Sequence, residues 1–97
     1  MQYRFEWDQT KARASLAKHG VSFEEAATVF RDPQMVSVYS GEHSDTEDRW
    51  ATLGISGIGR LLVVCHTFHA ASGEWATIRI ISSRRATRQE TRQYNTR

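Results

Sequence analysis

The spacing of apolar residues changes from a helical to a strand period at Asp32-Pro33. Before this point, the segment FEEAATVF (23–30) places apolar residues at i, i+3, i+4 and i+7, which is typical of a helix with one buried face. After it, segments rich in Val, Ile and Thr indicate strands. Because a residue before proline disfavours the helical conformation, the helix is expected to end near Asp32. The chain therefore has a helical N-terminal part and a sheet-forming remainder.

Capping residues and turns divide the chain into its predicted elements. Asp8 and Gly20 are suited to the N-cap and the C′ position of the first helix. The segments SFEE (22–25) and TRQE (87–90) match the capping box, in which Ser or Thr and Glu bind each other's backbone N–H groups. The predicted elements are a strand at 3–7, a helix at 9–19, a helix from 23 to about 32, strands at 35–40, 49–56, 60–68 and 74–82, and a short helix from 88.

These elements fit one α+β domain. Short connections between the last strands favour an antiparallel meander, and the N-terminal helices suffice to cover only one of its faces. We predict an antiparallel sheet with two N-terminal helices on one face and a short C-terminal helix, in the order β-α-α-β-β-β-β-α. A chain of 97 residues forms a single domain, 1–97. Without a long uncharged apolar run or a signal-like N-terminus, we expect a soluble, cytoplasmic protein that binds no membrane.

The C-terminal part of the chain concentrates positive charge. Residues 1–78 contain seven Lys or Arg and ten Asp or Glu, whereas residues 79–97 contain six Arg and one Glu. Only two of the 13 basic residues are Lys, and the planar guanidinium of Arg binds phosphate and carboxylate groups through paired hydrogen bonds. This end of the chain is therefore expected to meet RNA, DNA or an acidic protein.

Several segments, spread over nearly the whole chain, match one family pattern. They are "FEWD", "KHGVSFEEAATVF", "DP", "HSDTEDR", "GRLLVV", "HT" and "IRIIS-RRAT-E---Y". Together they resemble the BrnT family of bacterial toxins from type II toxin-antitoxin systems. The resemblance implies a RelE-like fold and a ribonuclease that inhibits translation. It further implies neutralisation by a BrnA-type antitoxin, in a heterotetramer built on an antitoxin dimer, with DNA bound only through the antitoxin.

The chain departs from this pattern in three places. Ser15 stands where the family commonly has Asn, and Ser83 stands where a small Ala is expected. The segment HTFHAASGEW (66–75) replaces the usual HTER and its short turn, so the Glu-Arg pair is missing.

Arg79 is the first candidate for a catalytic role. It lies in mid-strand among isoleucines, so its charge must point away from the core, on the strand face that also carries Trp75 and Thr77. One interpretation is an edge-strand charge that prevents aggregation. Because Arg79 belongs to the matched family motif, phosphate binding is favoured.

His66 and Arg84 are the other catalytic candidates. His66 alternates with apolar residues and is either a proton-transfer group, since imidazole changes charge near neutral pH, or a hydrogen-bonded core residue. Arg84 lies beside Arg85 at the corner before the last helix, where backbone N–H groups add to the positive field. Both arginines are expected to bind phosphate.

Further RNA-binding candidates have plausible structural alternatives. Arg88 is either a solvated helix charge or a contact to nucleic acid or antitoxin. Tyr94 stacks on a base or, as we favour, anchors the last helix. Arg49 pairs with the acidic loop before it or turns toward the basic face. Lys18 and His19 interact with the dipole of the first helix or contact substrate.

A metal site is not expected. In HSDTED (43–48), His43, Asp45 and Glu47 alternate, but a single histidine with scattered carboxylates is more typical of a solvated loop than of a set of metal ligands. We therefore expect no metal and no other cofactor.

The residues and the resemblance together favour a metal-independent endoribonuclease. Such an enzyme removes a proton from the 2′-OH, stabilises charge on the phosphate and protonates the leaving 5′ oxygen. Arg79 and Arg84 are expected to bind the phosphate, and His66 to assist proton transfer. The alternative is a non-catalytic binding module, whose basic C-terminal face engages only an acidic antitoxin or DNA.

Overall fold

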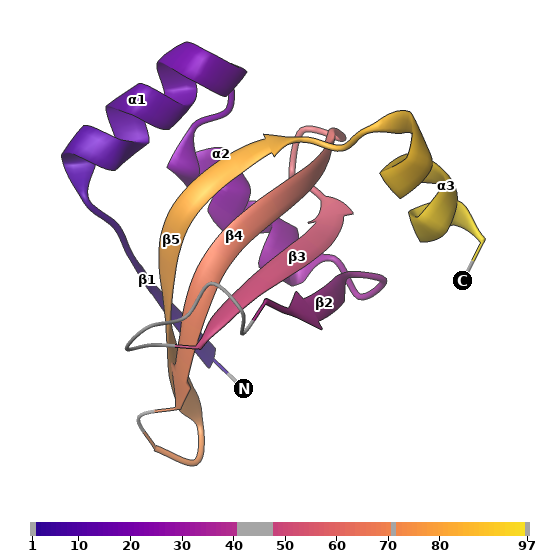
Figure 1. Ribbon diagram of the computed structural model, residues 1–97. Coiled ribbons are helices and arrows are strands. Elements are labelled where there is room, and N and C mark those ends of the chain that lie inside the picture. The colour runs from indigo at the N-terminus through magenta and orange to yellow at the C-terminus, as the bar shows by residue number, and fades with distance from the viewer. Residues whose placement is uncertain (1, 41–47, 71, 97) are drawn as a thin grey trace.

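The elements of the chain follow the predicted order β-α-α-β-β-β-β-α (Figure 1). The computed structural model describes residues 2–40, 48–70 and 72–96. The elements are β1 (Gln2–Glu6), α1 (Gln9–His19), α2 (Phe23–Thr28) with a 3₁₀ turn at Val29–Arg31, β2 (Val36–Tyr39), β3 (Arg49–Ile55), β4 (Leu61–Ala70), β5 (Trp75–Arg85) and α3 (Arg88–Asn95). Among the helices described, none is both long and apolar enough to cross a membrane.

The strands form one mixed sheet in the order β1-β5-β4-β3-β2. Strands β2 to β5 pair antiparallel, which confirms the predicted meander. Strand β1 pairs parallel with β5, so the predicted antiparallel sheet is corrected at this edge. The reason is that β1 reaches β5 through a long connection that includes both helices and not through a hairpin. The alternation of residues in β1 indicates a strand but carries no information about its partner.

Helices α1 and α2 cover one face of the sheet, as predicted (Figure 1). The core between the layers consists of Val21, Phe23, Ala26, Val29, Phe30, Leu62, Val64, Ile78 and Ile80. We call the opposite side of the sheet the open face. Helix α3 lies at one end of that face, where its side chains approach β2, β3 and β4.

The predicted caps define the helix ends. Asp8 Oδ1 accepts a hydrogen bond from the backbone N of Thr10 at 2.7 Å, and Gly20 adopts a φ of 71° at the end of α1. The capping box at 87–90 is complete. In the box predicted at the start of α2, only Ser22 accepts from the backbone of Glu25, at 3.0 Å. That prediction was half wrong, because the Glu25 carboxylate binds elsewhere.

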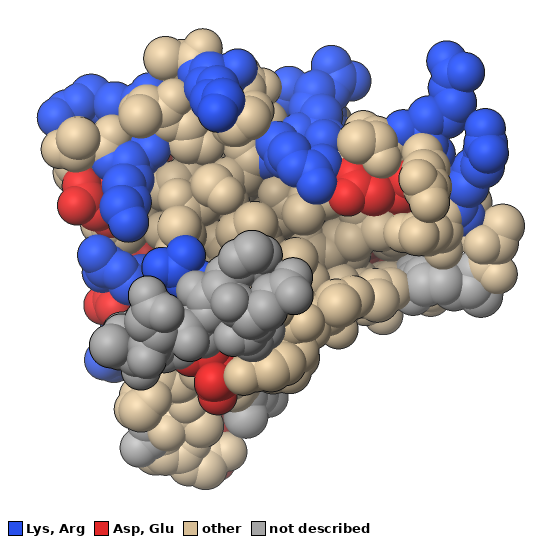
Figure 2. All heavy atoms as spheres, viewed as in Figure 1, with Lys and Arg blue, Asp and Glu red and all other residues tan. Residues whose placement is uncertain are grey.

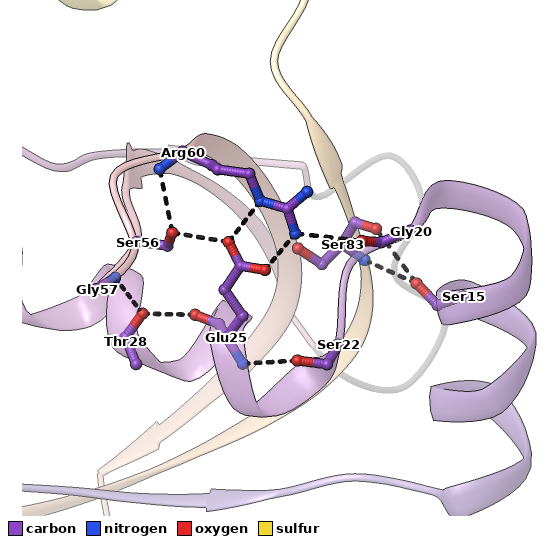
Figure 3. A network of polar contacts seen from close by, with 9 residues as sticks. All are labelled: Ser15, Gly20, Ser22, Glu25, Thr28, Ser56, Gly57, Arg60 and Ser83. Carbon is purple, nitrogen blue, oxygen red and sulfur yellow. Dashed lines mark hydrogen bonds and ion pairs between the residues drawn. The ribbon is translucent and has the colours of Figure 1, made fainter.

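The Glu25 carboxylate is held by Arg60 from the turn between β3 and β4 (Figure 3). Arg60 Nε donates to Glu25 Oε2 at 2.9 Å, and its Nη2 donates to the Gly20 carbonyl at 3.1 Å. The Ser56 hydroxyl also donates to Glu25 Oε2, at 2.7 Å. The Arg60 guanidinium thereby lowers the pKa of Glu25. This network ties the corner between α1 and α2 to the sheet.

Two departures from the family pattern meet in space. Ser15 of α1 and Ser83 of β5 are both buried. The Ser15 hydroxyl donates to the Ser83 carbonyl at 3.2 Å and accepts from the Ser83 backbone N at 3.3 Å (Figure 3). The Ser15 hydroxyl therefore fixes α1 on β5 through the backbone of Ser83.

The Glu25 network predicts a pH-dependent contribution to stability. Glu25→Gln is expected to lower the free energy of unfolding at pH 7 by about 2 kcal/mol, because a charged hydrogen-bonding partner of Arg60 is lost. The folded pKa of Glu25 lies below its ordinary value of 4.5, so the stabilisation is present above that pH and disappears as pH falls through the folded pKa. Urea unfolding of both proteins from pH 7 to pH 3 measures this difference.

The exposed neighbour Glu24 provides the control. Glu24→Gln should change the free energy of unfolding by less than about 0.5 kcal/mol. A Glu25→Gln protein as stable as wild type at pH 7 would contradict the account.

Candidate active site on the open face

Strand β5 divides its side chains between the two faces of the sheet. Ala76, Ile78 and Ile80 are buried against the helices. Trp75 and Thr77 alternate with them, as does Arg79, whose side chain is 42% exposed. The predicted direction of the Arg79 side chain, away from the core, is confirmed.

The strand register places Arg79 in a row of polar residues across the open face. Glu6 of β1 lies on one side of it, and Thr67 of β4 lies on the other, followed by Arg49 of β3. Arg79 Nη1 is 3.7 Å from Glu6 Oε1. An exposed pair at this distance is weak, so the guanidinium remains available to a phosphate group.

A polar cavity of about 700 Å³ opens beside Arg79. Its lining residues are Glu6, Asp48, Thr67, Phe68, His69, Thr77 and Arg79. The cavity thus combines one guanidinium, two carboxylates and an imidazole. The guanidinium can bind an anionic group, and the carboxylates and the imidazole are groups that can transfer protons.

An aromatic side chain lies farther along the same face. Trp75 is 38% exposed, and the guanidinium carbon of Arg4 lies 5.4 Å from the centre of its ring. This is a cation–π contact, which holds the indole ring in place. The exposed ring is a surface on which an unpaired base can stack.

His66 points to the opposite, helix-covered side and is 3% exposed. Its Nδ1 donates to the Thr67 carbonyl at 3.0 Å, because a carbonyl can only accept. Its Nε2 lies 2.6 Å from the Thr52 hydroxyl, and its ring packs edge-on against Phe30. Burial lowers the pKa of His66, which favours the neutral ring. The structure therefore shows the hydrogen-bonded core arrangement and does not bring His66 and Arg79 together.

Arg84 and Arg85 point away from each other. Arg84 forms two hydrogen bonds with the Glu90 carboxylate, at 2.8 and 2.9 Å. This pairing lowers the pKa of Glu90 to about 2. Arg85 is exposed and pairs in register with Leu62, a core residue of the helix-covered side. The two predicted phosphate ligands therefore do not converge with Arg79.

The other predicted RNA contacts are spread over the molecule. Arg88 is exposed on α3. The Tyr94 hydroxyl donates to Asp32, as expected of a residue that anchors this helix. Lys18 and His19 end α1, in the layer behind the sheet. Figure 2 shows the open face, with Lys and Arg along its rim and over α3 around a hollow surface of other residues.

The hollow beside α3 is apolar. A cavity of about 440 Å³ lies there, and we call it the apolar trough. Its lining residues are Val36, Val38, Ala51, Leu53, Val63, Glu90 and Gln93. Val38 is 59% exposed. Aliphatic side chains of this kind suit a protein segment better than nucleotide bases, which stack on aromatic rings.

The alternating residues of the segment HSDTED, considered above as metal ligands, lie outside the part of the chain that the structure describes. His43, Asp45 and Glu47 are not among the described residues. Within the ranges that are described, no three His, Cys, Asp or Glu side chains come close enough together to hold a metal ion.

Sequence reasoning missed Glu6 and His69. Glu6 alternates with aromatic residues in β1, but only the parallel pairing with β5 shows that it adjoins Arg79. His69 is three residues from His66 and points to the other face. Residues three positions apart in a strand lie on opposite faces, so the sequence indicates that the two histidines do not share a face. Only the strand register shows that His69 is the one on the face of Arg79.

Comparison with known proteins gives one family and one fold. The model of the family described as "Ribonuclease toxin, BrnT, of type II toxin-antitoxin system" matches residues 7–90. Among solved structures, the crystal structure of the Brucella abortus ribonuclease toxin BrnT superposes with a TM-score of 0.62 at 17% sequence identity. The match covers 91% of this chain and 100% of that one. No curated protein matches.

The ion pair between Arg84 and Glu90 predicts a measurable pKa change. In Arg84→Gln, the pKa of Glu90 should rise from about 2 toward its ordinary value of 4.5, because the first cause of its depression is removed. NMR titration of the Glu90 carboxyl group measures it. Arg88→Gln, on the same helix, is the control and should leave the value near 2. A Glu90 that still titrates near 2 in Arg84→Gln would show that the pair is not formed.

Proposed function

The chain belongs to the BrnT family of ribonuclease toxins from type II toxin-antitoxin systems, and from this premise we propose that it cleaves RNA at the open face of its sheet. The proposal includes cleavage without a metal, inhibition of translation in the cytoplasm, and action as a single domain over residues 1–97. The observation that carries it is Arg79, held in a polar row beside a cavity on the open face.

Arg79 would bind the phosphate that is attacked. Cleavage by the neighbouring 2′ oxygen creates additional negative charge on the phosphorus oxygens, and a preorganised guanidinium stabilises that charge more in the transition state than in the substrate. Arg49, in the same row, would add a second cation. In this proposal, His66 acts from the helix-covered side of the sheet. Its hydrogen bond orients the carbonyl of Thr67, the residue of β4 that pairs with Arg79.

Trp75 favours single-stranded RNA as the substrate. It lies four residues from Arg79 on the same face, which corresponds to about 13 Å along an extended strand. A base stacked on Trp75 would position the backbone near Arg79. RNA contacts by Arg84, Arg85, Arg88, Lys18, His19 and Tyr94 remain predictions.

The cognate antitoxin would occupy the apolar trough. We propose a BrnA-type antitoxin that inserts an acidic, amphipathic segment, with its apolar side on Val38 and Leu53 and its charges toward Arg88 and Arg92 of α3. The exposed arginines of α3 and the aliphatic lining of the trough support this partner. The proposed complex is a heterotetramer built on an antitoxin dimer, which alone contacts DNA.

The trough also favours a second candidate function. A chain that uses only this surface would be a binding module for the antitoxin, without catalysis. Tight antitoxin binding together with intact RNA would establish that alternative.

Substitution of Arg79 tests the ribonuclease proposal. Arg79→Ala should reduce the rate of RNA cleavage by about 10²–10³-fold, as expected when one donor to a developing oxyanion is removed. Induced expression should then no longer arrest growth. Arg79→Lys should recover only part of the activity, because the ammonium lacks the paired donors.

Cleavage is measured by mapping new 5′ ends in total RNA and with purified protein. Glu24→Gln, an exposed substitution on α2, is the matched control and should cleave like wild type. A folded Arg79→Ala protein that cleaves at the wild-type rate would refute the assignment.

Substitution of Val38 tests the trough. Val38→Glu should raise the dissociation constant of the antitoxin about thirtyfold or more, because it places a charge on an apolar contact and repels acidic residues. RNA cleavage should be unchanged, so the antitoxin should no longer relieve growth arrest. Titration calorimetry measures the affinity, and Val38→Thr, which has a similar volume, is the control. Equal affinity of Val38→Glu and wild type would exclude the trough.

A further inference from the structure

His69 occupies the same face as Arg79. It lies two residues beyond Thr67 on β4, and both side chains line the polar cavity. His69 pairs with Thr77, so Arg79 is its diagonal neighbour across the strands. Diagonal neighbours lie about 7–8 Å apart, with their Cβ atoms somewhat closer, and long side chains with a phosphate held between them can bridge this span.

Glu6 reaches Arg79 from the other side. Strand β1 borders β5 on one edge and β4 borders it on the other, so Glu6 and His69 flank the guanidinium. In-line displacement at phosphorus needs one group beside the attacking oxygen and another beside the leaving oxygen, on opposite sides of the phosphate. The arrangement of the three strands provides these two positions.

Other charged groups surround the cavity. Asp48, before β3, lines the cavity directly. In the strand register, Arg4 of β1 is level with His69, and Arg49 of β3 is level with Arg79. Among the described histidines, His66 faces the other side of the sheet and His19 ends α1. His69 is therefore the imidazole that the described part of the chain places beside Arg79.

We propose that Glu6 is the general base and His69 the general acid of RNA cleavage, an inference that rests on the proposed function. The Glu6 carboxylate takes the proton of the 2′-OH, and the 2′ oxygen forms a bond to phosphorus. The bond from phosphorus to the 5′ oxygen breaks, and the His69 imidazolium gives that oxygen a proton. The products are a 2′,3′-cyclic phosphate and a 5′-OH. His69 lies in the segment that replaces the family's HTER, so this acid belongs to the chain's own variant of the site.

The test compares two RNA substrates that differ only in the leaving atom. One is an oligonucleotide with a mapped cleavage site, and the other carries sulfur in place of the bridging 5′ oxygen at that site. A thiolate leaves without protonation. His69→Gln should therefore lower kcat on the oxygen substrate about a hundredfold with little change in KM, and cleave the sulfur substrate at nearly the wild-type rate. Glu6→Gln should lower kcat on both substrates.

The pH profile gives a second readout. The pH dependence of kcat on the oxygen substrate should differ between wild type and His69→Gln, because the variant lacks the proton donor. Glu24→Gln is again the control. Equal losses by His69→Gln on both substrates, or no loss on either, would overturn the inference while leaving the Arg79 result intact. A wild-type protein that cleaves neither substrate would overturn the proposed function itself.

Discussion

The alternation of side chains along β5 determines both the core and the candidate site. This strand lies between β1 and β4, and it offers Ala76, Ile78 and Ile80 to the helices. Burial of that apolar side requires both N-terminal helices to pack on one face, where the Glu25–Arg60 network fixes their corner. The helices therefore leave Arg79 on the opposite, open face of β5. The two-residue alternation that buries one side of β5 in the core therefore also places the candidate site on its other side.

The geometry separates two uses of the open face. Its polar part lies around Arg79 and the cavity beside it, whereas its apolar part lies in the trough beside α3. In the proposed function, RNA meets the first and the antitoxin meets the second. Because both lie on one side of one sheet, an antitoxin segment bound in the trough would stand next to the reacting phosphate. Neutralisation would then follow from occupancy of a neighbouring surface, without a change of fold.

Much of the fold and one site residue, Arg79, could be predicted from local signals, whereas the rest of the site could not. The cap at Asp8, the stop at Gly20 and the complete capping box at Thr87 depend on neighbouring residues, and all three are confirmed. The parallel placement of β1 depends on distant pairing, and so does the diversion of Glu25 from its cap to Arg60. The convergence of Glu6 and His69 on Arg79 rests on the same kind of long-range register. Arg79 could be predicted because the alternation of side chains within one strand is enough to show which face it occupies.

RNA binding can be followed by NMR, with an oligoribonucleotide whose methylated 2′ oxygens cannot attack. Binding of RNA to the open face should produce amide shift changes that concentrate in residues 4–6 of β1, 67–69 of β4 and 75–79 of β5. Changes that concentrate at Lys18 and His19 of α1, with β5 unaffected, would contradict it and place RNA on the helical layer.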